Sequence, residues 1–184
     1  MNWNELLLSQ ITWHWDHQLR DRLAGLTDAE YFWEPAPNSW NVRPRGTSTA
    51  PVQGGSGAFT IDLAMPEPTP PPVTTIAWRL GHVIVGVLAA RNAAHFGREP
   101  TDYFSFAYAP TAAEALTQLD TEYATWLAGV EKADLTVACG DSEGPHGHLP
   151  MAALVLHIHR ELIHHLSEIS LLRDLHRTCF REEN

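Results

Sequence analysis

One stretch constrains the fold more than any other: residues 150–177, PMAALVLHIHRELIHHLSEISLLRDLHR. Pro150 suits the first position of a helix, where no backbone N–H is needed, and no Gly or Pro interrupts the remainder. At 100° per residue the apolar side chains share one face about 120° wide, formed by Leu154, Ile158, Leu162, Leu166, Ile169 and Leu172. The spacing therefore predicts one long helix with a single side facing the core.

Two polar side chains, Glu161 and His165, lie on or beside this apolar face. They are four residues apart, so they meet on the helix surface, whereas His157 and His164 point away from the face. Burying an unpaired charge is costly, so this pair needs a partner. A metal ion held by the pair and a third ligand would satisfy it, and so would a plain hydrogen bond between the two side chains.

The charge of the chain excludes two classes of partner. The 184 residues carry a formal net charge of −10, and Lys132 is the only lysine. Binding to nucleic acid or to an anionic membrane depends on clustered Lys and Arg, so we expect neither. The N-terminal residues do not resemble a signal peptide, and Cys139 and Cys179 form no CxxC motif. We expect a cytoplasmic protein with reduced thiols and no transmembrane segment.

Three further helices are predicted along the chain. Helical spacing marks residues 3–23, and a capping box from Thr27 to Glu30 then starts a short turn of helix. Residues 76–96 are apolar on almost every side, which is typical of a buried helix, and Gly97 closes this helix. A second capping box opens a helix over residues 111–130.

Residues 38–73 differ from the rest of the chain because they are rich in Gly and Pro. We expect a long elaborated loop rather than a second domain, since the segment holds too few apolar residues for a core. Its apolar runs, 40–42 and 59–63, predict a short hairpin, and the residues between them look mobile. The linker 97–110 is long enough for the helices on both sides of it to run parallel. We expect all 184 residues to form one domain, 1–184.

A third metal ligand is available on the buried helix. Along residues 76–90 the only strongly polar side chains are Arg79 and His82, so His82 is expected inside the molecule. A core histidine bound to a backbone carbonyl is the plainer explanation. Together with Glu161 and His165, however, His82 gives the ligand set of a catalytic zinc ion with an open fourth position, and the same set suits iron or nickel. A di-iron site needs a second Glu-x-x-His, which no other predicted helix carries.

The sequence TIAWRLGHVI, followed much later by HIHRELIHHLSEISLLRDL, resembles the DinB-like superfamily. The resemblance is closest to its mycothiol-dependent maleylpyruvate isomerase-like metal-binding branch, and it extends to the N-terminal WHWDHQLRDRLAGLTDAEYFWEP. It implies an all-α fold, a four-helix bundle with up-down-down-up topology, here with residues 38–73 inserted between the first two helices. It also implies that His82, Glu161 and His165 bind a divalent metal ion, zinc above all.

The resemblance implies a function as well. The metal ion would activate a low-molecular-weight thiol such as mycothiol, in a thiol transferase or a thiol-dependent isomerase. A metal-dependent hydrolase and a non-catalytic bundle that binds a metal or a small ligand remain open. The expected partner is a small-molecule substrate or thiol, and a homodimer is a further open alternative. We expect Trp15 or His14 in the walls of the metal pocket, with residues 38–73 at its mouth.

Overall fold

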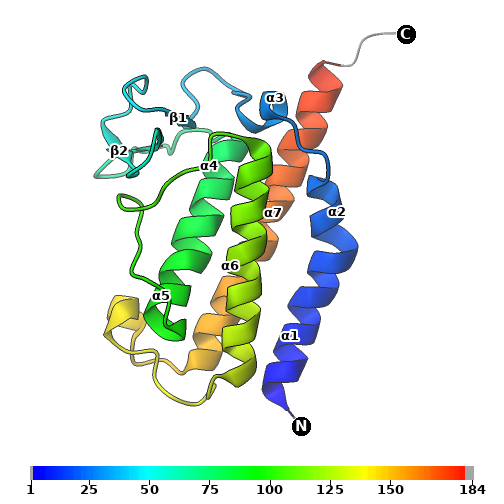
Figure 1. The fold of residues 1–184 in the computed structure, drawn as a ribbon, viewed down its shortest axis with the longest axis vertical. Helices are drawn as coiled ribbons and strands as arrows, with labels where there is room; N and C mark the ends of the chain where they lie inside the picture. Colours follow the sequence, from blue (N-terminus) through cyan, green and yellow to red (C-terminus); the bar gives the residue numbers. More distant parts are fainter. Residues whose placement is uncertain (1, 181–184) are drawn as a thin grey trace.

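A computed structural model describes residues 2–180 of the chain. Within this range the protein is mostly helical, with a small three-stranded sheet. Four long helical segments lie side by side along the long axis (Figure 1). They are α1 (Trp3–His14) with η1 (Trp15–Leu19) and α2 (Arg20–Leu23); α4 (Ile76–Gly81) with η2 (His82–Ala89) and α5 (Ala90–Phe96); α6 (Ala112–Lys132); and α7 (Met151–Cys179). No helix among the described residues is long and apolar enough to cross a membrane.

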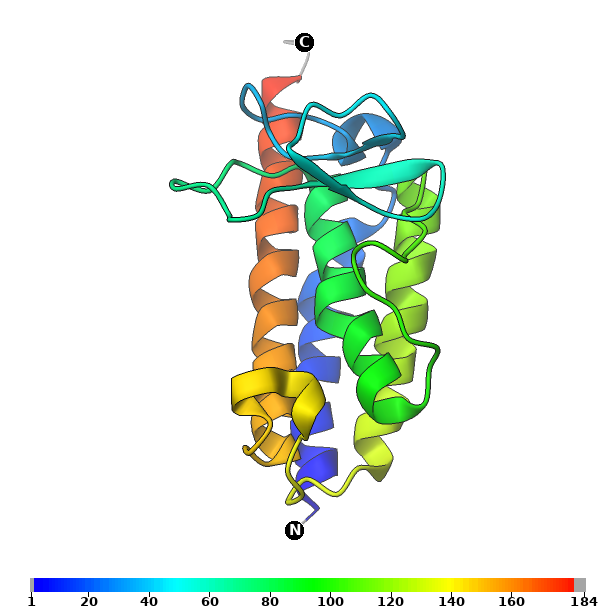
Figure 2. The same cartoon turned by 90° about the vertical axis from the view of Figure 1, so that its left-hand side faces the viewer.

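The four segments run in two opposite directions. The first segment and α7 run away from the end of the molecule that holds the N-terminus (Figure 1, Figure 2). The α4–η2–α5 segment and α6 both run back towards that end, and the linker between them returns along their side (Figure 2). The two middle segments are therefore parallel, as the length of the 97–110 linker predicts.

The long C-terminal helix is confirmed, with its predicted apolar face in the core. Helix α7 begins at Met151, directly after Pro150 in an extended conformation. Five of the six predicted face residues are buried and Leu172 is partly buried. His159 and Arg173 are also buried on this helix, although the apolar pattern predicts neither. Periodicity locates the core side of a helix, but it does not show which polar groups find partners there.

The helix predicted over residues 76–96 is present and mostly buried, but it is not uniform. Its centre, η2, is a π-helix of eight residues that begins at His82, and η1 is a similar interruption of the first segment. Gly97 ends the segment in the left-handed conformation, with φ of 71°, as the sequence predicts. Wider π turns break the usual i to i−4 ladder, and they occur often at functional sites.

The Gly- and Pro-rich segment holds the three strands β1 (Val42–Pro44), β2 (Val52–Gly54) and β3 (Phe59–Leu63), in the order β1-β3-β2. Both outer strands are antiparallel to β3, with Val42 opposite Ile61. The predicted pairing of the two apolar runs is therefore found, although its first strand starts at Val42 and Trp40 instead bridges to Thr74. The residues expected to be mobile contain β2. This sheet lies against the side of α4, near the end of the molecule opposite the N-terminus (Figure 2).

The short helices lie in the connections. Helix α3 (Asp28–Tyr31) has the predicted capping box, in which Thr27 and Glu30 each accept a hydrogen bond from the backbone N–H of the other. The connection before α7 contains the 3₁₀ helix η3 (Asp141–His146). Each of these short helices carries an acidic side chain with little exposure to solvent. Glu30 in α3 is buried, and the side chain of Glu143 in η3 is 9% exposed.

A buried ion pair ties α3 to α7. The side chains of Arg173 and Glu30 are only 3% and 6% exposed, and Nε of Arg173 donates to Oε1 of Glu30 at 2.8 Å. Arg173 also donates to the carbonyls of Arg22 and Ala24. Burial raises the pKa of Glu30, but hydrogen bonds from Arg173 and from the backbone of Thr27 outweigh it and lower the pKa to about 2.

Replacing Glu30 with Gln should lower the free energy of unfolding at pH 7 by about 3–5 kcal/mol, because Arg173 stays buried without its counter-charge. The folded pKa of about 2 lies below the ordinary value of 4.5. The stabilisation is therefore complete above about pH 4.5 and is lost as the pH falls towards 2. Urea unfolding at pH 7 and pH 3 measures both effects.

The control Asp174→Asn removes an exposed partner of Arg22 and should lower the free energy of unfolding by less than about 1 kcal/mol. Equal losses in both variants would contradict the prediction.

Candidate metal centre

The structure places the three predicted ligands on two packed elements. His82 begins η2, and Glu161 and His165 lie one turn apart on α7, which packs against η2. The rings of His82 and His165 have centroids 4.7 Å apart and are nearly perpendicular, at 83°. Nε2 of His165 lies 3.4 Å from Oε2 of Glu161. Residues about 80 positions apart in sequence are thus brought to one place.

Two aromatic rings contact the imidazole of His82. Trp78 stacks on it at 5.5 Å and 9°, and the Tyr103 ring lies nearly parallel to it, at 19° with the ring centroids 6.2 Å apart. The Tyr103 hydroxyl lies 2.5 Å from Nδ1 of His82. A Cβ atom on Gly86 would overlap this hydroxyl, so a glycine is needed one π turn after His82. Since Nδ1 is occupied by Tyr103, Nε2 is the nitrogen that remains for another ligand.

The electrostatic surroundings keep His82 neutral. Burial and, to a lesser extent, the nearby His165 lower the pKa of His82 to about 4, although Glu161 opposes the shift. An imidazole binds a metal ion only in its neutral form. At neutral pH this side chain is therefore in the protonation state that coordination requires.

The imidazole of His165 is oriented by a second carboxylate. Nδ1 of His165 lies 2.9 Å from Oε2 of Glu168, and Glu168 in turn forms an ion pair with Arg79 of α4. Metal-binding histidines typically donate their second ring N–H to a carboxylate, which fixes the ring and makes the free nitrogen more basic. Here that arrangement leaves Nε2 of His165 facing Glu161.

A second group of possible ligands lies on α7 alone. One ligand atom each from His164, His165 and Glu168 lie within 4.8 Å of one another. The His164 side chain is 61% exposed, however, and the Glu168 carboxylate is already neutralised by Arg79. A metal ion here would compete with a guanidinium for its only carboxylate. Among residues 2–180 the predicted set of His82, Glu161 and His165 does not bring one ligand atom from each residue within this distance, and its carboxylate, Glu161, lies 3.6 Å from Nε of Arg160.

A cavity of about 180 Å³, the inner cavity, lies beside the predicted ligands. It is lined by His82, Gly86, Val87, Arg91, Tyr103, His157, Ile158 and Glu161. Neither Trp15 nor His14 lines it, contrary to expectation, and Trp15 instead stacks on Tyr123 at 3.8 Å. The 38–73 segment does not line it either. That segment reaches the site through Trp78, whose Nε1 donates to the carbonyl of Asp62 at 2.7 Å.

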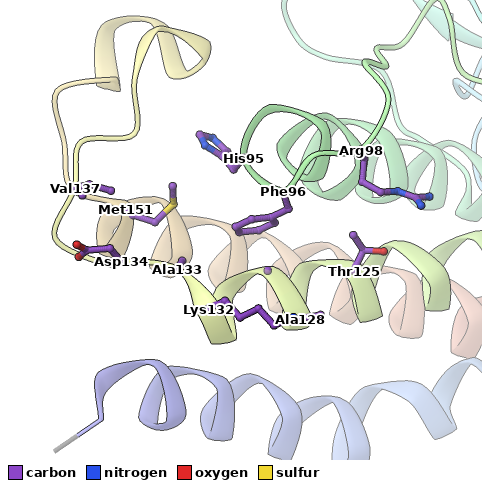
Figure 3. A pocket seen from close by; sticks show the side chains of 11 residues that line it. His95, Phe96, Arg98, Thr125, Ala128, Lys132, Ala133, Asp134, Val137 and Met151 are labelled. Carbon is purple, nitrogen blue, oxygen red and sulfur yellow. The ribbon is translucent and has the colours of Figure 1, made fainter.

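A larger cavity, of about 650 Å³, lies between α5, α6 and the start of α7 (Figure 3). Its lining contains one imidazole, His95, and one carboxylate, Asp134, and these lie on different sides of the pocket in Figure 3. The remaining side chains there are apolar, hydroxyl-bearing or cationic. The inner cavity is the smaller of the two, and it is the one that two of the predicted ligands, His82 and Glu161, line.

The sequence did not indicate the side chains that orient the two imidazoles. Tyr103 lies in the 97–110 linker, where no periodic pattern or motif marks it. Glu168 follows His165 by three residues, so helical spacing alone could have identified it as a neighbour. With both orienting groups included, the donor set is two imidazole nitrogens and one carboxylate beside an accessible space, which fits a divalent metal ion.

Comparison with known proteins gives one match. The model of a family described as the DinB superfamily matches residues 10–169, a range that includes His82, Glu161 and His165. No curated protein and no solved structure matches the chain. The match covers most of the sequence and describes the superfamily as a whole, without selecting one of its branches.

Replacing Tyr103 with Phe should weaken Zn²⁺ binding by about 10- to 100-fold, because Nδ1 of His82 loses the hydroxyl that orients the ring. Competition with a chromophoric chelator measures the affinity. Tyr108→Phe is the matched control, since its hydroxyl donates to the Tyr103 carbonyl and does not contact His82. Equal affinities for the wild type and Tyr103→Phe would show that this hydroxyl does not orient a metal ligand.

Proposed function

The chain belongs to the DinB superfamily, and we propose that it is a metal-dependent enzyme of the DinB type. Its metal ion is held by His82, Glu161 and His165. The observation that carries the proposal is that a side chain occupies Nδ1 of each imidazole, while Nε2 of His165 faces Glu161. In the same proposal, the four long helical segments form the family's up-down-down-up four-helix bundle in one domain, with residues 38–73 as an insertion.

Zinc is the first candidate for the ion, with nickel and iron as alternatives, because imidazole and carboxylate ligands suit all three. Three protein ligands leave a further coordination position. The inner cavity beside His82 and Glu161 gives a small molecule access to that position, which supports a catalytic site over a closed structural one. A structural site would be closed by a fourth side chain.

A divalent ion at this site would supply positive charge that favours the deprotonated form of a thiol or of water. Residues around the proposed ion orient its ligands and add charge to the cavity wall. Burial raises the pKa of Tyr103 to about 12, so its hydroxyl stays protonated at neutral pH, and its oxygen can accept the Nδ1–H of a neutral His82 that binds the ion through Nε2. The Arg79–Glu168 pair holds His165 in place. Arg91 adds a cation to the cavity wall.

The proposed nucleophile is a low-molecular-weight thiol such as mycothiol, and the proposed reaction is thiol transfer or thiol-dependent isomerisation. The volume of the inner cavity supports a small reactant over a macromolecular one. A metal-dependent hydrolase is the alternative that uses the same ligands with water. A non-catalytic bundle that binds a metal or a small ligand would need the same residues but no reactant.

Single replacements on α7 and η2 separate the two possible ligand groups. His82→Ala, Glu161→Ala and His165→Ala should each remove most of the bound metal, whereas His164→Ala should keep it, because His164 is exposed and outside the proposed set. Elemental analysis of protein purified without a His tag measures metal per chain. Stoichiometric metal in His82→Ala together with loss in His164→Ala would identify the His164–His165–Glu168 group instead.

The cobalt-substituted protein should bind a low-molecular-weight thiol, because the proposed site has an open position and favours the thiolate. Titration with mycothiol, bacillithiol, glutathione and cysteine should produce a charge-transfer band in the near ultraviolet with at least one of them. Glu161→Ala protein should give no such band. If no thiol produces a band although cobalt is bound, the hydrolase or the non-catalytic alternative is the better explanation.

A further inference from the structure

A second cavity, the outer cavity, adjoins the inner one. It has a volume of about 520 Å³ and shares Arg91 and His157 with the inner cavity. Its walls come from α5, η3 and the first turns of α7. A volume of several hundred Å³ is that of a site for a small molecule. The two cavities together extend from the proposed metal ligands to the loop before α7.

Two arginines from different elements line the outer cavity, Arg91 on α5 and Arg160 on α7. This is a local exception in a chain whose formal net charge is −10. One carboxylate, Glu143, also lines the cavity, but His95 contacts it at 3.0 Å and Arg91 at 3.5 Å. The walls therefore carry more positive than negative charge.

Both guanidinium groups keep hydrogen-bond donors available. Arg91 donates from Nη1 to the carbonyl of Gly86, while its Nε is buried with no partner among residues 2–180. Arg160 bonds to Nδ1 of His157 through Nη2, at 2.7 Å, and its Nε lies 3.6 Å from Oε1 of Glu161; the side chain is 70% exposed, so its remaining N–H groups can face a ligand. A guanidinium has five N–H donors, and its fork matches the oxygens of a carboxylate or phosphate.

We propose that the outer cavity binds the oxyanion of a small-molecule substrate, a carboxylate or a phosphate monoester, between Arg91 and Arg160. The remainder of the substrate then extends past His157 into the inner cavity. The oxyanion site itself depends only on the two arginines. The inference that the rest of the substrate points towards the proposed metal ligands rests on the proposed function.

A short anion fits these observations better than an extended one. The two arginines lie in one concave site, and the acidic chain around it repels a long polyanion. A neutral substrate would form no charge-assisted hydrogen bond with the remaining N–H groups of the two arginines. The proposed metal ion, with one carboxylate ligand, adds further positive charge on the inner side of the same space.

The test is equilibrium binding of benzoate, phenyl phosphate and neutral benzamide to the full chain, by titration calorimetry, with zinc and after its removal. Benzoate or phenyl phosphate should bind at least about tenfold more tightly than benzamide, because charged hydrogen bonds form with the arginines. The stronger of the two identifies the oxyanion. Arg91→Gln and Arg160→Gln should each lose about tenfold in affinity. Because Arg160 is exposed, its variant tests the site even where Arg91→Gln fails to fold.

Arg98→Gln is the matched control, since Arg98 is 51% exposed and does not line the outer cavity. It should bind the anion as the wild type does. Equal binding of benzamide and the anions, or wild-type affinity in Arg160→Gln, would overturn the proposal. Metal per chain is measured in the same samples. If the anion still binds after zinc is removed, the oxyanion site is supported independently of the proposed metal site. If the protein holds zinc but does not bind the anion, the oxyanion site is overturned and the proposed metal site is not.

Discussion

The carboxylate of Glu168 joins the two elements on which the candidate site depends. It forms an ion pair with Arg79 of α4 and contacts Nδ1 of His165 on α7. Without it, Arg79 would be a largely buried cation between two apolar helix faces, which is a costly arrangement. The same interaction fixes the His165 ring and places His82, three residues after Arg79, beside it. One carboxylate thus compensates a buried charge and orients a proposed ligand.

The π-helix η2 provides the space in which this site is built. It begins at His82, and the carbonyl of Gly86 within it accepts a hydrogen bond from Nη1 of Arg91. Gly86 has no side chain, and Tyr103 fills the place that a Cβ atom would take. A regular helix with a larger residue at this position would exclude the Tyr103 hydroxyl from His82. The interruption therefore brings a linker residue and a cavity-lining arginine to the same turn.

The sequence predicted the features that depend on periodicity. The phase of α7 places Glu161 and His165 at the edge of its buried face, and the apolar surroundings of His82 place it beside them. The π turns were not predictable, because the composition of residues 82–89 suits an ordinary buried helix equally well. Tyr103 was missed because a linker side chain is positioned by tertiary packing alone. Strand β2 was missed for the same reason, since its three residues pair only because β3 lies beside them.

The stacking of Trp78 on His82 connects the small sheet to the proposed ligands. The Trp78 ring donates to the carbonyl of Asp62 in β3 and packs near Trp40, so the 38–73 segment holds the ring that covers His82. A substitution in the 38–73 segment can therefore shift the Trp78 ring and, with it, the position of His82, while all three proposed ligands stay the same. In evolutionary terms, this segment is a region in which selection could adjust the rigidity of His82, and with it the reactivity of the site, while the three ligands stay constant.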